Sequence, residues 1–432
     1  MYDYRVKKEN VEGKPVAVVL GGTVPHGDLI KLLKKRNFHT IVIDYFDNPP
    51  AAKYADVHCH ESAMDYDVVL EVARENKAVL ILSSCLDQQI NIAMKAAEEL
   101  GIAHPFSPEQ ALMVTDKKLM KKRMMESGIP TSRYYVVDKD TDITGIELTY
   151  PVIVKPADSC GSAGIVKLED AVGLEKAVRE SMQWSDSGKV IVEEFVTGTE
   201  MSVHGYVEAG KVHLLFGTCK ITSIQEEKYQ QLCNVYVPRL KESLQKELER
   251  IAGLIVDKFG IPVCTPLFMQ VIVRGTKVSV IEFSPRVAGG MASYVASEYA
   301  GFDLLNYSID SYLGEHRNHG TGRLEKFVCC HPLYCKDGIL KEIKGVNDVL
   351  DQGIARRMFL LKELGDHIDT SKPSSSNVMK YVIEGDTALE CYEKMQQANE
   401  LTEIYDVDGR PMRDYSFILT KEQFEEKLKE II

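Results

Sequence analysis

Three polar side chains at alternating positions follow a strand-like run in the second half of the chain. Val278–Ile281 consists of small and β-branched residues, the composition of a buried strand. Glu282, Ser284 and Arg286 come next, so an extended backbone presents all three on one face. Gly289-Gly290 then predicts a loop whose backbone can approach a ligand closely. Converging oxygen ligands beside one guanidinium suit a Mg²⁺ ion that bridges phosphate groups.

A preceding strand carries a further polar side chain, Gln270, and the two strands read as a hairpin. Arg274 to Lys277 has the composition of the connecting turn. If the hairpin pairs symmetrically about that turn, the side chains of Gln270 and Glu282 can meet. The plainer alternative is a strand end with a solvent-exposed Glu–Arg pair. The coincidence of polar alternation with the following proline and glycines favours the functional interpretation.

Lys155 ends a second apolar run and is followed by a glycine- and serine-rich turn, Asp158–Gly164. A lysine at a strand end beside such a turn can direct one ammonium and several backbone N–H groups at phosphate oxygens. The turn does not match G-x-x-x-x-G-K-[ST], and taken alone it is about equally consistent with an ordinary hairpin turn.

A third segment, Val190–Val196, is followed by Gly198 and Glu200. A flat base could lie against this segment, and Glu200 could accept a hydrogen bond from a ribose hydroxyl. The alternative is a strand that ends in a solvent-exposed acidic hinge. Lys220, in Gly-Thr-Cys-Lys-Ile-Thr-Ser, is equally consistent with a phosphate or substrate contact and with a solvated side chain.

The elements that must position these side chains are of two kinds, so the predicted fold class is α/β and α+β. Residues 15–105 alternate strands (15–20, 40–44, 78–82) with helices (28–35, 66–75, 88–100), which predicts a parallel, Rossmann-like sheet covered by helices. Its first turn, Gly-Gly-Thr-Val-Pro-His-Gly, does not match G-x-G-x-x-G, but a turn at that edge can line a substrate crevice.

The remainder of the chain reads as α+β. A helix opens at Thr115, and residues 131–196 form a small unit of strands around one helix. Residues 197–315 carry the hairpin, and residues 321–432 add further strands and a helix at 386–404.

Composition excludes some classes of function. The chain has 432 residues, enough for about three domains, with 44% hydrophobic and 27% charged residues. A net charge of −12 argues against non-specific binding to nucleic acid or anionic membranes. We expect no membrane span, no signal peptide and a cytoplasmic protein whose ten cysteines are reduced thiols.

Three clusters that imitate metal sites are better explained otherwise. Asp138, Asp140 and Asp142 lack the glycine and glutamate of a calcium loop, which predicts a turn. His58-Cys59-His60 has no further ligands nearby and reads as an irregular loop. Cys329 and Cys335 would lie about 20 Å apart on one strand, too far for one zinc ion.

The order of these features resembles that of the ATP-grasp superfamily, in which two α+β lobes clamp ATP between antiparallel sheets. The likeness covers most of the chain and is strongest to single-chain carboxylate–amine (L-amino acid) ligases, with similarity to one half of carbamoyl-phosphate synthetase large subunits. It implies an N-terminal pre-ATP-grasp domain (1–114), an ATP-grasp domain (115–320) with a lid subdomain at about 131–196, and a C-terminal segment (321–432) packed on an antiparallel catalytic body.

The resemblance also implies roles for individual residues. The expected nucleotide contacts are Lys117 and Lys155 on phosphates, Gly161, Ser162 and Gly164 in the covering loop, Glu193, Glu194, Phe195 and Val196 along the adenine hinge, and Glu200 on the ribose. The expected metal ligands are Gln270, Glu282 and Ser284, and the expected substrate contacts are Arg286, Gly289, Gly290 and Lys220. Arg286 and Lys155 would be the catalytic residues.

Two of these positions depart from the family pattern. Gln270 stands where glutamate is more common, although carbamoyl-phosphate synthetases also have glutamine there, and Ser284 replaces asparagine.

The resemblance predicts an ATP- and Mg²⁺- (or Mn²⁺-) dependent ligase that joins a small carboxylate to an amine through an acyl phosphate. A homodimer is one expected assembly. A carboxylase or purine-pathway enzyme, and a nucleotide-binding regulatory protein without turnover, remain alternatives.

Overall fold

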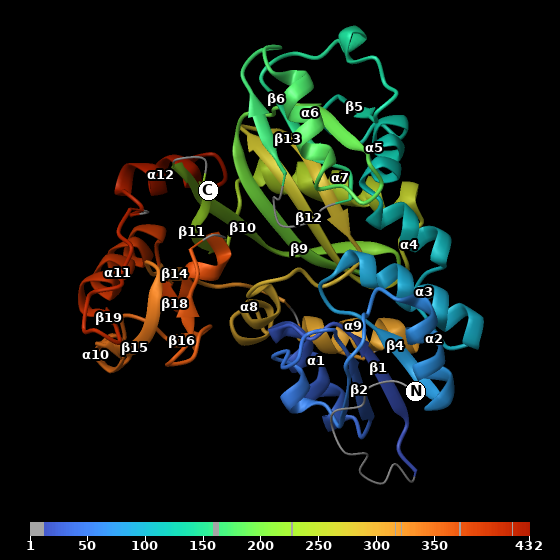
Figure 1. Ribbon diagram of the computed structural model, residues 1–432, viewed down its shortest axis with the longest axis horizontal. Helices are drawn as coiled ribbons and strands as arrows, with labels where there is room; N and C mark the ends of the chain where they lie inside the picture. Colours follow the sequence, from blue (N-terminus) through green and yellow to red (C-terminus); the bar gives the residue numbers. More distant parts are fainter. Residues whose placement is uncertain are drawn as a thin grey trace.

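The computed structural model describes residues 13–158, 164–225, 228–315, 317–320, 322–370, 373–416 and 418–432. Within these residues the strands form four sheets. Figure 1 shows the N-terminal unit at the bottom, a small lid sheet at the top, and the long strands of a central sheet between them, with the C-terminal segment to one side. The predicted combination of an α/β unit with antiparallel α+β parts is confirmed.

The N-terminal unit is the predicted parallel sheet, with strand order β3-β2-β1-β4. Its strands are almost entirely buried because helices cover both faces, which explains their unbroken apolar runs. Val57–Cys59 forms an edge strand, so the prediction of an irregular loop at His58 and Cys59 is wrong. A strand of three residues is too short to show a recognisable sequence pattern. The elements are β1 (Val16–Leu20), α1 (Val24–Lys35), β2 (His39–Ile43), η1 (Ala52–Tyr54), β3 (Val57–Cys59), α2 (Tyr66–Glu75), β4 (Ala78–Leu82) and α3 (Asp87–Leu100).

Two helices lead from this unit into a four-stranded antiparallel sheet with the order β5-β8-β6-β7. Helix α6 begins directly after Gly173, which adopts a φ of +83°. Asp138–Asp142 forms the predicted turn, in which the Asp138 carboxylate accepts hydrogen bonds from Asp140 N and Thr141 Oγ1. The elements are α4 (Pro108–Thr115), α5 (Lys117–Glu126), β5 (Tyr134–Val137), η2 (Ile143–Gly145), β6 (Val152–Pro156), β7 (Val166–Leu168), α6 (Leu174–Met182) and β8 (Val190–Glu194).

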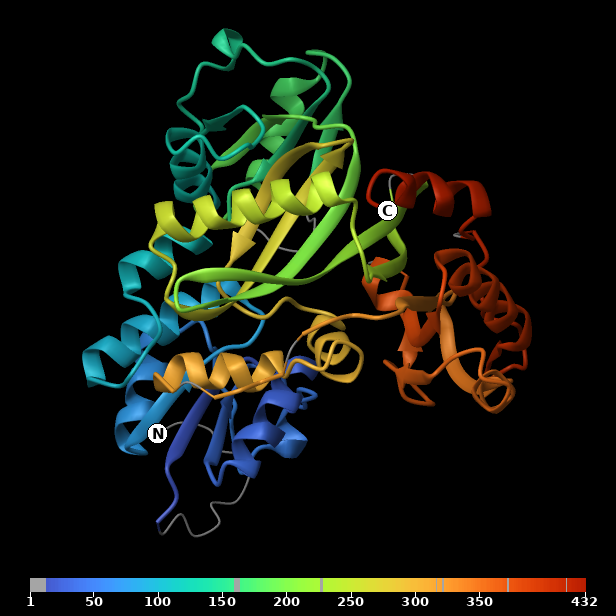
Figure 2. The same cartoon turned by 180° about the vertical axis from the view of Figure 1, so that it is seen from behind.

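The central sheet is antiparallel and has eight described strands in the order β13-β12-β9-β10-β11-β14-β18-β16. Helix α7 crosses one face, as Figure 2 shows from behind, and buries residues spaced three or four apart such as Leu244, Leu248, Ile251 and Ile255. The opposite face of β12 and β13 carries the polar residues of the predicted site. The elements of this part are β9 (Thr199–Glu208), β10 (Lys211–Gln225), β11 (Lys228–Val237), α7 (Glu242–Phe259), β12 (Cys264–Arg274), β13 (Lys277–Ser284), α8 (Ala292–Glu298) and α9 (Leu304–Leu313).

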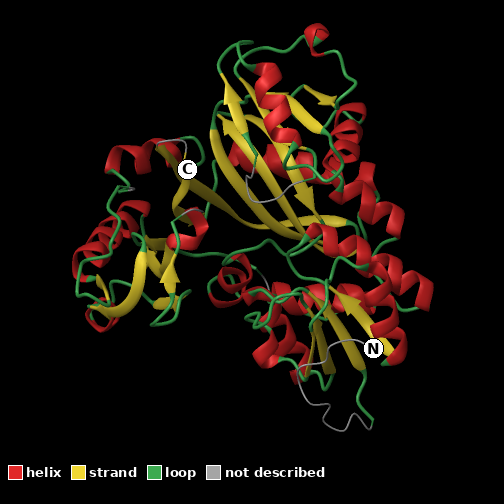
Figure 3. Ribbon diagram, in the orientation of Figure 1, coloured by secondary structure: helices red, strands yellow, loops and turns green. Residues whose placement is uncertain are grey.

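The C-terminal segment shares the central sheet, since β14 pairs with β11 and carries β18 and β16 beyond it. The predicted domain boundary at 320/321 therefore separates segments whose strands hydrogen-bond to each other, and it stays a prediction. A second small sheet, β17-β15-β19, and three helices complete the segment (Figure 3). The elements are β14 (Phe327–Tyr334), β15 (Gly338–Lys344), α10 (Val346–Asp351), β16 (Arg357–Leu360), β17 (His367–Ile368), η3 (Pro373–Ser376), β18 (Asn377–Gly385), α11 (Ala388–Leu401), β19 (Glu403–Asp406) and α12 (Lys421–Lys429).

Helix α9 holds the N-terminal unit against the central sheet. Ile309 and Tyr312 of this helix belong to the apolar core of the N-terminal unit, and Tyr307 lies in a cluster with the central strands. Arg36, at the end of α1, forms an ion pair with the buried Asp310 of α9. No helix among the described residues combines the length and the apolar character needed to cross a bilayer.

Helix α12 is part of the central core. Its Phe424 and Leu428 are 1% and 2% exposed and lie in the largest apolar cluster, and Lys427 O accepts a hydrogen bond from Thr199 Oγ1 at 3.1 Å. We predict that Phe424→Ala lowers the free energy of unfolding by about 3–5 kcal/mol, the range for truncating a buried phenylalanine. Urea unfolding followed by circular dichroism measures this. Glu425→Ala on the exposed side of the helix is the control, and equal effects of the two substitutions would contradict the packing of α12.

Candidate active site

The hairpin of β12 and β13 brings Gln270 and Glu282 together by way of a one-residue bulge. Arg274 pairs with Lys277 and Val271 with Val280, as symmetric pairing requires, but the register then shifts and Gln270 pairs with Glu282. Without the shift, Gln270 would lie opposite Ile281. The extra residue also changes which positions of β13 are buried, from Val278 and Val280 before it to Phe283 after it.

Four polar side chains form a row across four adjacent strands of the central sheet. Lys220 of β10 forms an ion pair with Glu200 of β9, with 2.9 Å between Nζ and Oε1. Gln270 Nε2 of β12 donates to the same Glu200 oxygen at 2.5 Å, and Glu282 of β13 pairs with Gln270 in register. All four residues are partly exposed, so the row lines an accessible face rather than the core.

A buried cluster joins the lid sheet to helix α5 beside this row. Glu193 of β8 accepts from Lys155 Nζ through Oε1, and its Oε2 lies 2.6 Å from Lys121 Nζ and 2.9 Å from Ser132 Oγ. Lys121 is 2% exposed and also donates to Ser132 Oγ at 2.8 Å. Two ammonium groups therefore share one carboxylate, and all three groups are largely buried.

Burial and charge pull the pKa values of this cluster in opposite directions. Burial alone would raise the pKa of Glu193, but the charges of Lys155 and Lys121 lower it to about 2. Burial lowers the pKa of Lys121, an effect that Glu193 and Glu282 oppose and that Lys155 reinforces. Glu193 is therefore ionised at any physiological pH.

Arg286 is buried between the central body and the N-terminal unit. Its Nε and Nη2 donate to the two carboxylate oxygens of Asp87 at 2.7 and 2.5 Å, and Nη1 donates to Val287 O at 3.0 Å. Ser284 Oγ donates to Asp87 Oδ1 at 2.7 Å. Burial by itself lowers the pKa of Arg286, but the Asp87 charge raises this pKa above its ordinary value. Burial by itself raises the pKa of Asp87, but the Arg286 charge outweighs this effect and lowers the pKa of Asp87.

The remaining predicted residues lie around this arrangement. Lys117 opens α5, and its charge contributes to the lowered pKa of Asp87. Gly289 and Gly290 are exposed in the loop after β13. Gly161 and Ser162 lie outside the described residues, and Gly164, with a φ of +69°, packs against Trp184.

The predicted adenine hinge spans the end of β8 and the two residues after it, and three of its groups are already engaged. The Glu193 side chain points to Lys155 and Lys121, so this residue can face a base only through its backbone. Phe195 N donates to Pro151 O at 2.8 Å, and Glu194 Oε1 accepts from Thr149 N. Val196 is half-buried between them and Gly198, which lies so close to β12 that an added Cβ would stand 2.4 Å from Val273 O.

The oxygen atoms of Gln270, Glu282 and Ser284, the predicted metal ligands, suit a divalent cation. Because the Gln270 amide nitrogen faces Glu200, its carbonyl oxygen is turned away from Glu200, and Ser284 keeps its oxygen lone pairs while donating its proton to Asp87. Glu282 supplies the one carboxylate of the predicted metal ligands. Among the described residues no three His, Cys, Asp or Glu side chains gather closely enough to hold a metal, so a cation here would need ligand oxygens from a bound phosphate.

Sequence reasoning missed Asp87, Lys121 and Ser132. Asp87 had a recognisable signal, since it begins a helix just after a parallel strand, at the edge where ligands of such sheets bind. Lys121 had none: it is one of several lysines in α5, and its burial depends on where the lid sheet packs.

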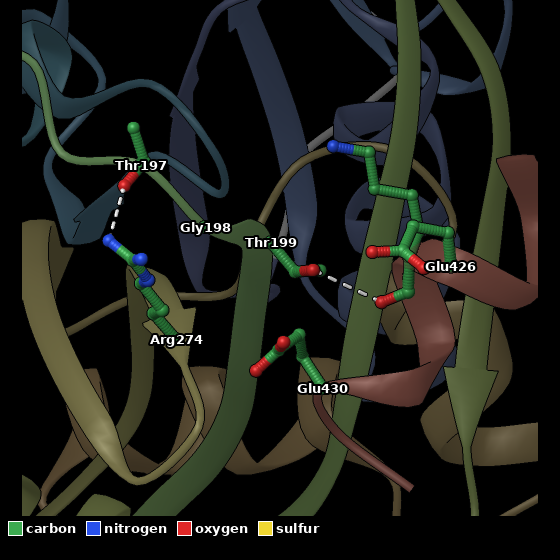
Figure 4. A pocket seen from close by; sticks show the side chains of 7 residues that line it. Thr197, Gly198, Thr199, Arg274, Glu426 and Glu430 are labelled. Carbon is green, nitrogen blue, oxygen red and sulfur yellow. Dashed lines mark hydrogen bonds between the residues drawn. The ribbon is translucent and has the colours of Figure 1, made fainter.

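A cavity of about 480 Å³ lies beside the hinge but contains none of the predicted site residues (Figure 4). It is lined by Thr197, Gly198, Thr199, Arg274, Glu426, Lys427 and Glu430. Arg274 Nη1 donates to Thr197 Oγ1 at 3.1 Å within it. Thr199 is buried and bonded to α12, whereas Glu200 belongs to the polar row, so the cavity and the row lie on opposite faces of β9.

The lid sheet lies above the central antiparallel sheet, and a lysine–carboxylate cluster joins the lid to helix α5. The family description of the ATP-grasp domain matches residues 148–294, so this chain contains an ATP-grasp domain there.

Its relatives match parts of the chain in sequence and most of it in structure. VanA, a vancomycin/teicoplanin A-type resistance protein of Enterococcus faecium, is 29% identical over 139 residues, which cover 30% of this chain and 40% of VanA. A D-alanine–D-alanine ligase of Gloeobacter violaceus is 31% identical over 110 residues, 24% of this chain and 36% of the ligase. This chain thus spans well under half the length of these relatives. The L-amino acid ligase of Bacillus licheniformis has the same fold, with a TM-score of 0.76 at 18% identity over 93% of this chain and 100% of that one. The similarity to carbamoyl-phosphate synthetase stays a prediction.

The Glu193 cluster predicts how stability changes with pH. The folded-state pKa of Glu193, about 2, lies below its ordinary 4.5, so its stabilisation is fully present above pH 4.5 and is lost as the pH falls toward 2. At about 1.4 kcal/mol per pKa unit, this amounts to about 3 kcal/mol. We predict that Glu193→Gln lowers the free energy of unfolding at pH 7 and that its difference from wild type shrinks between pH 5 and 2.5.

Urea unfolding at several pH values measures this difference. Glu194→Gln, which changes the neighbouring carboxylate that accepts one backbone hydrogen bond, is the control. A difference between wild type and Glu193→Gln that does not vary with pH would contradict the ionised cluster.

Proposed function

We propose that this chain is an ATP-dependent, ADP-forming ligase that joins a small carboxylate to an amine through an acyl phosphate, on amino-acid-like substrates. The carrying observation is the polar row Lys220–Glu200–Gln270–Glu282 beside the Lys155–Glu193–Lys121 cluster on an ATP-grasp fold. Several of the sequence relatives are D-alanine–D-alanine ligases, which supports the amino-acid class.

In this proposal the nucleotide lies between the lid and central sheets. Lys155 and Lys117 neutralise phosphate oxygens, and the hinge at Glu194–Val196 contacts the base through its backbone. Glu200 accepts a hydrogen bond from the ribose hydroxyl. The same carboxylate also accepts from Lys220 and Gln270. Positioning and charge neutralisation are what phosphoryl transfer requires of a protein.

Glu282, Gln270 and Ser284 would hold Mg²⁺, which when bound neutralises phosphate charge. Arg286 and Lys220 are the cations at the substrate end, where Gly289 and Gly290 allow close approach. Arg286 can stabilise charge as it develops on the acyl-phosphate oxygens. The amine then displaces phosphate from the acyl carbon, and the products are the amide, ADP and phosphate.

The test of this function is substrate-dependent ADP release at high Mg²⁺. Amino acids, singly and in pairs, and bicarbonate are supplied with ATP, and products are identified by mass spectrometry. Amine-dependent ADP release with an amide product is expected, and Arg286→Lys, which keeps the charge and loses the planar fork, should turn over at least 10²-fold more slowly. Dependence on bicarbonate alone would replace the ligase by a carboxylase. ATP binding without turnover would indicate a regulatory nucleotide-binding protein. This is the alternative that a neutral amide at Gln270, among the predicted metal ligands, favours.

Lys155 should be required for nucleotide affinity. We predict that Lys155→Met weakens ATP binding at least tenfold, because a charge-assisted hydrogen bond contributes about 1.5–3 kcal/mol. Glu193 keeps Lys121 as its partner in this variant, so the fold should survive. Calorimetry measures the affinity, with Lys176→Met on the exposed face of α6 as the control. Equal ATP affinities in both variants would remove Lys155 from the site.

Gln270 should set the affinity for the metal. Gln270→Glu places a third carboxylate beside Glu200 and Glu282, and a hard cation binds carboxylate oxygen more strongly than amide oxygen. We predict that this variant reaches half-maximal turnover at a lower Mg²⁺ concentration. Gln352→Glu, on an exposed residue of the C-terminal segment, is the control. An unchanged Mg²⁺ dependence would mean that the side chain does not reach the metal.

A further inference from the structure

The hydrogen bonds of Arg286 leave little of its guanidinium for a ligand. The group has five N–H donors, and Asp87 takes the Nε and Nη2 edge in a two-point contact. Nη1 donates to Val287 O. Two N–H groups remain, one on each Nη atom. Arg286 therefore cannot offer its Nε–Nη2 edge to a substrate carboxylate while Asp87 stays in place.

Asp87 and Arg286 come from different units of the protein. Asp87 is the first residue of α3 in the N-terminal unit, and Arg286 follows β13 of the central sheet, 199 positions later. The guanidinium also lies over the Phe268 ring, with 5.6 Å between Cζ and the ring centroid. The orientation of Arg286 thus depends on the packing of one unit against the other.

The Asp87 carboxylate is itself held at several points. Ser284 Oγ donates to Oδ1 at 2.7 Å, and Lys117 adds a nearby positive charge. The position at the start of α3 places the carboxylate where the helix dipole favours negative charge. Since Arg286 is 9% exposed, removing Asp87 would leave a buried guanidinium without its counter-ion. These contacts are expected of a carboxylate that holds Arg286 in place permanently. They are not expected of one that occupies the site of a substrate carboxylate and is displaced when the substrate binds.

We propose that Asp87 is a positioning residue for Arg286: by holding the Nε–Nη2 edge, it directs the two remaining N–H groups toward the reacting phosphoryl oxygens. The inference rests on the proposed ligase function for what those oxygens belong to. It assigns the N-terminal unit a part in the phosphoryl chemistry, through one carboxylate that contacts no substrate.

The first experiment compares Asp87→Asn, Asp87→Glu and the control Asp67→Asn. Asp67 lies exposed in the first turn of α2 and forms none of the ion pairs found among the described residues. We expect Asp87→Asn to lower kcat by about 10²-fold, the scale for misplacing a catalytic group, with little change in ATP affinity. Asp87→Glu keeps the charge and should recover part of the loss. Asp87→Asn combined with Arg286→Lys should be no slower than Arg286→Lys alone, because both act through one group.

The opposite result has a distinct signature. If Asp87 occupied the place of a substrate carboxylate, Asp87→Asn would raise turnover or lower the KM for the carboxylate, and the proposal would be overturned. A kcat for Asp87→Asn equal to that of Asp67→Asn would overturn it as well.

A second measurement does not depend on activity. The Nε–H of Arg286 is identified by nuclear magnetic resonance of arginine-labelled protein, as the signal missing from Arg286→Lys. Its hydrogen exchange should accelerate at least tenfold in Asp87→Asn and stay unchanged in Asp67→Asn. Unchanged exchange in Asp87→Asn overturns the proposal even if the protein is a ligase. Accelerated exchange in a protein without ADP release places the failure in the proposed function instead.

Discussion

Two buried ammonium groups that share one carboxylate join the lid sheet to the helix that precedes it. Lys155 comes from a lid strand, Lys121 from the preceding helix and Glu193 from a second lid strand. Glu193 must be ionised and in place for the two lysines to lie so close, because like charges in a medium of low polarity repel strongly. The segment between helix and lid is bound to the central sheet as well, since Thr131 Oγ1 donates to Val280 O and Val280 N donates to Pro130 O. These contacts thus link the lid, helix α5 and β13.

The central sheet supplies the second half of the candidate site, and its accuracy depends on register. A strand pair with a regular ladder would have placed Ile281 opposite Gln270, and the carboxylate of Glu282 would have been displaced by one residue. The bulge is the local device that sets Gln270, Glu282 and Ser284 beside one another while Val278 and Phe283 remain in the core. Beyond β11, the same sheet continues into the C-terminal segment, and α12 of that segment packs back against Thr199 of β9. The C-terminal segment is therefore joined mechanically to the strand that carries Glu200.

The N-terminal unit is coupled to this body at two places of different chemistry. Helix α9 contributes apolar side chains to the N-terminal core and an ion pair from Asp310 to Arg36. Near the candidate site the coupling is polar, through Asp87, Arg286 and Ser284. The apolar contact fixes the relative position of the units, and the polar contact transmits that position to a guanidinium at the substrate end. The cavity beside the hinge is separate from this arrangement, on the other face of β9.

The sequence by itself determined the features that depend on local pattern. Unbroken apolar strands alternating with helices predicted the parallel N-terminal sheet, because backbone propensity and side-chain periodicity act over a few residues. The ATP-grasp fold was predicted by the resemblance of the order of lysines, glycines and acidic residues to that family. Tertiary structure alone decided the rest. Lys121 differs from its neighbouring lysines only in the residues that pack over it, and the partner of Asp87 lies 199 residues away in the sequence. The register of Gln270 and Glu282 depends on a bulge that the hairpin sequence does not predict. The continuation of the central sheet into β14, β18 and β16 is of the same kind, since strand pairing over long separations is set by the fit of whole surfaces and not by the composition of either strand.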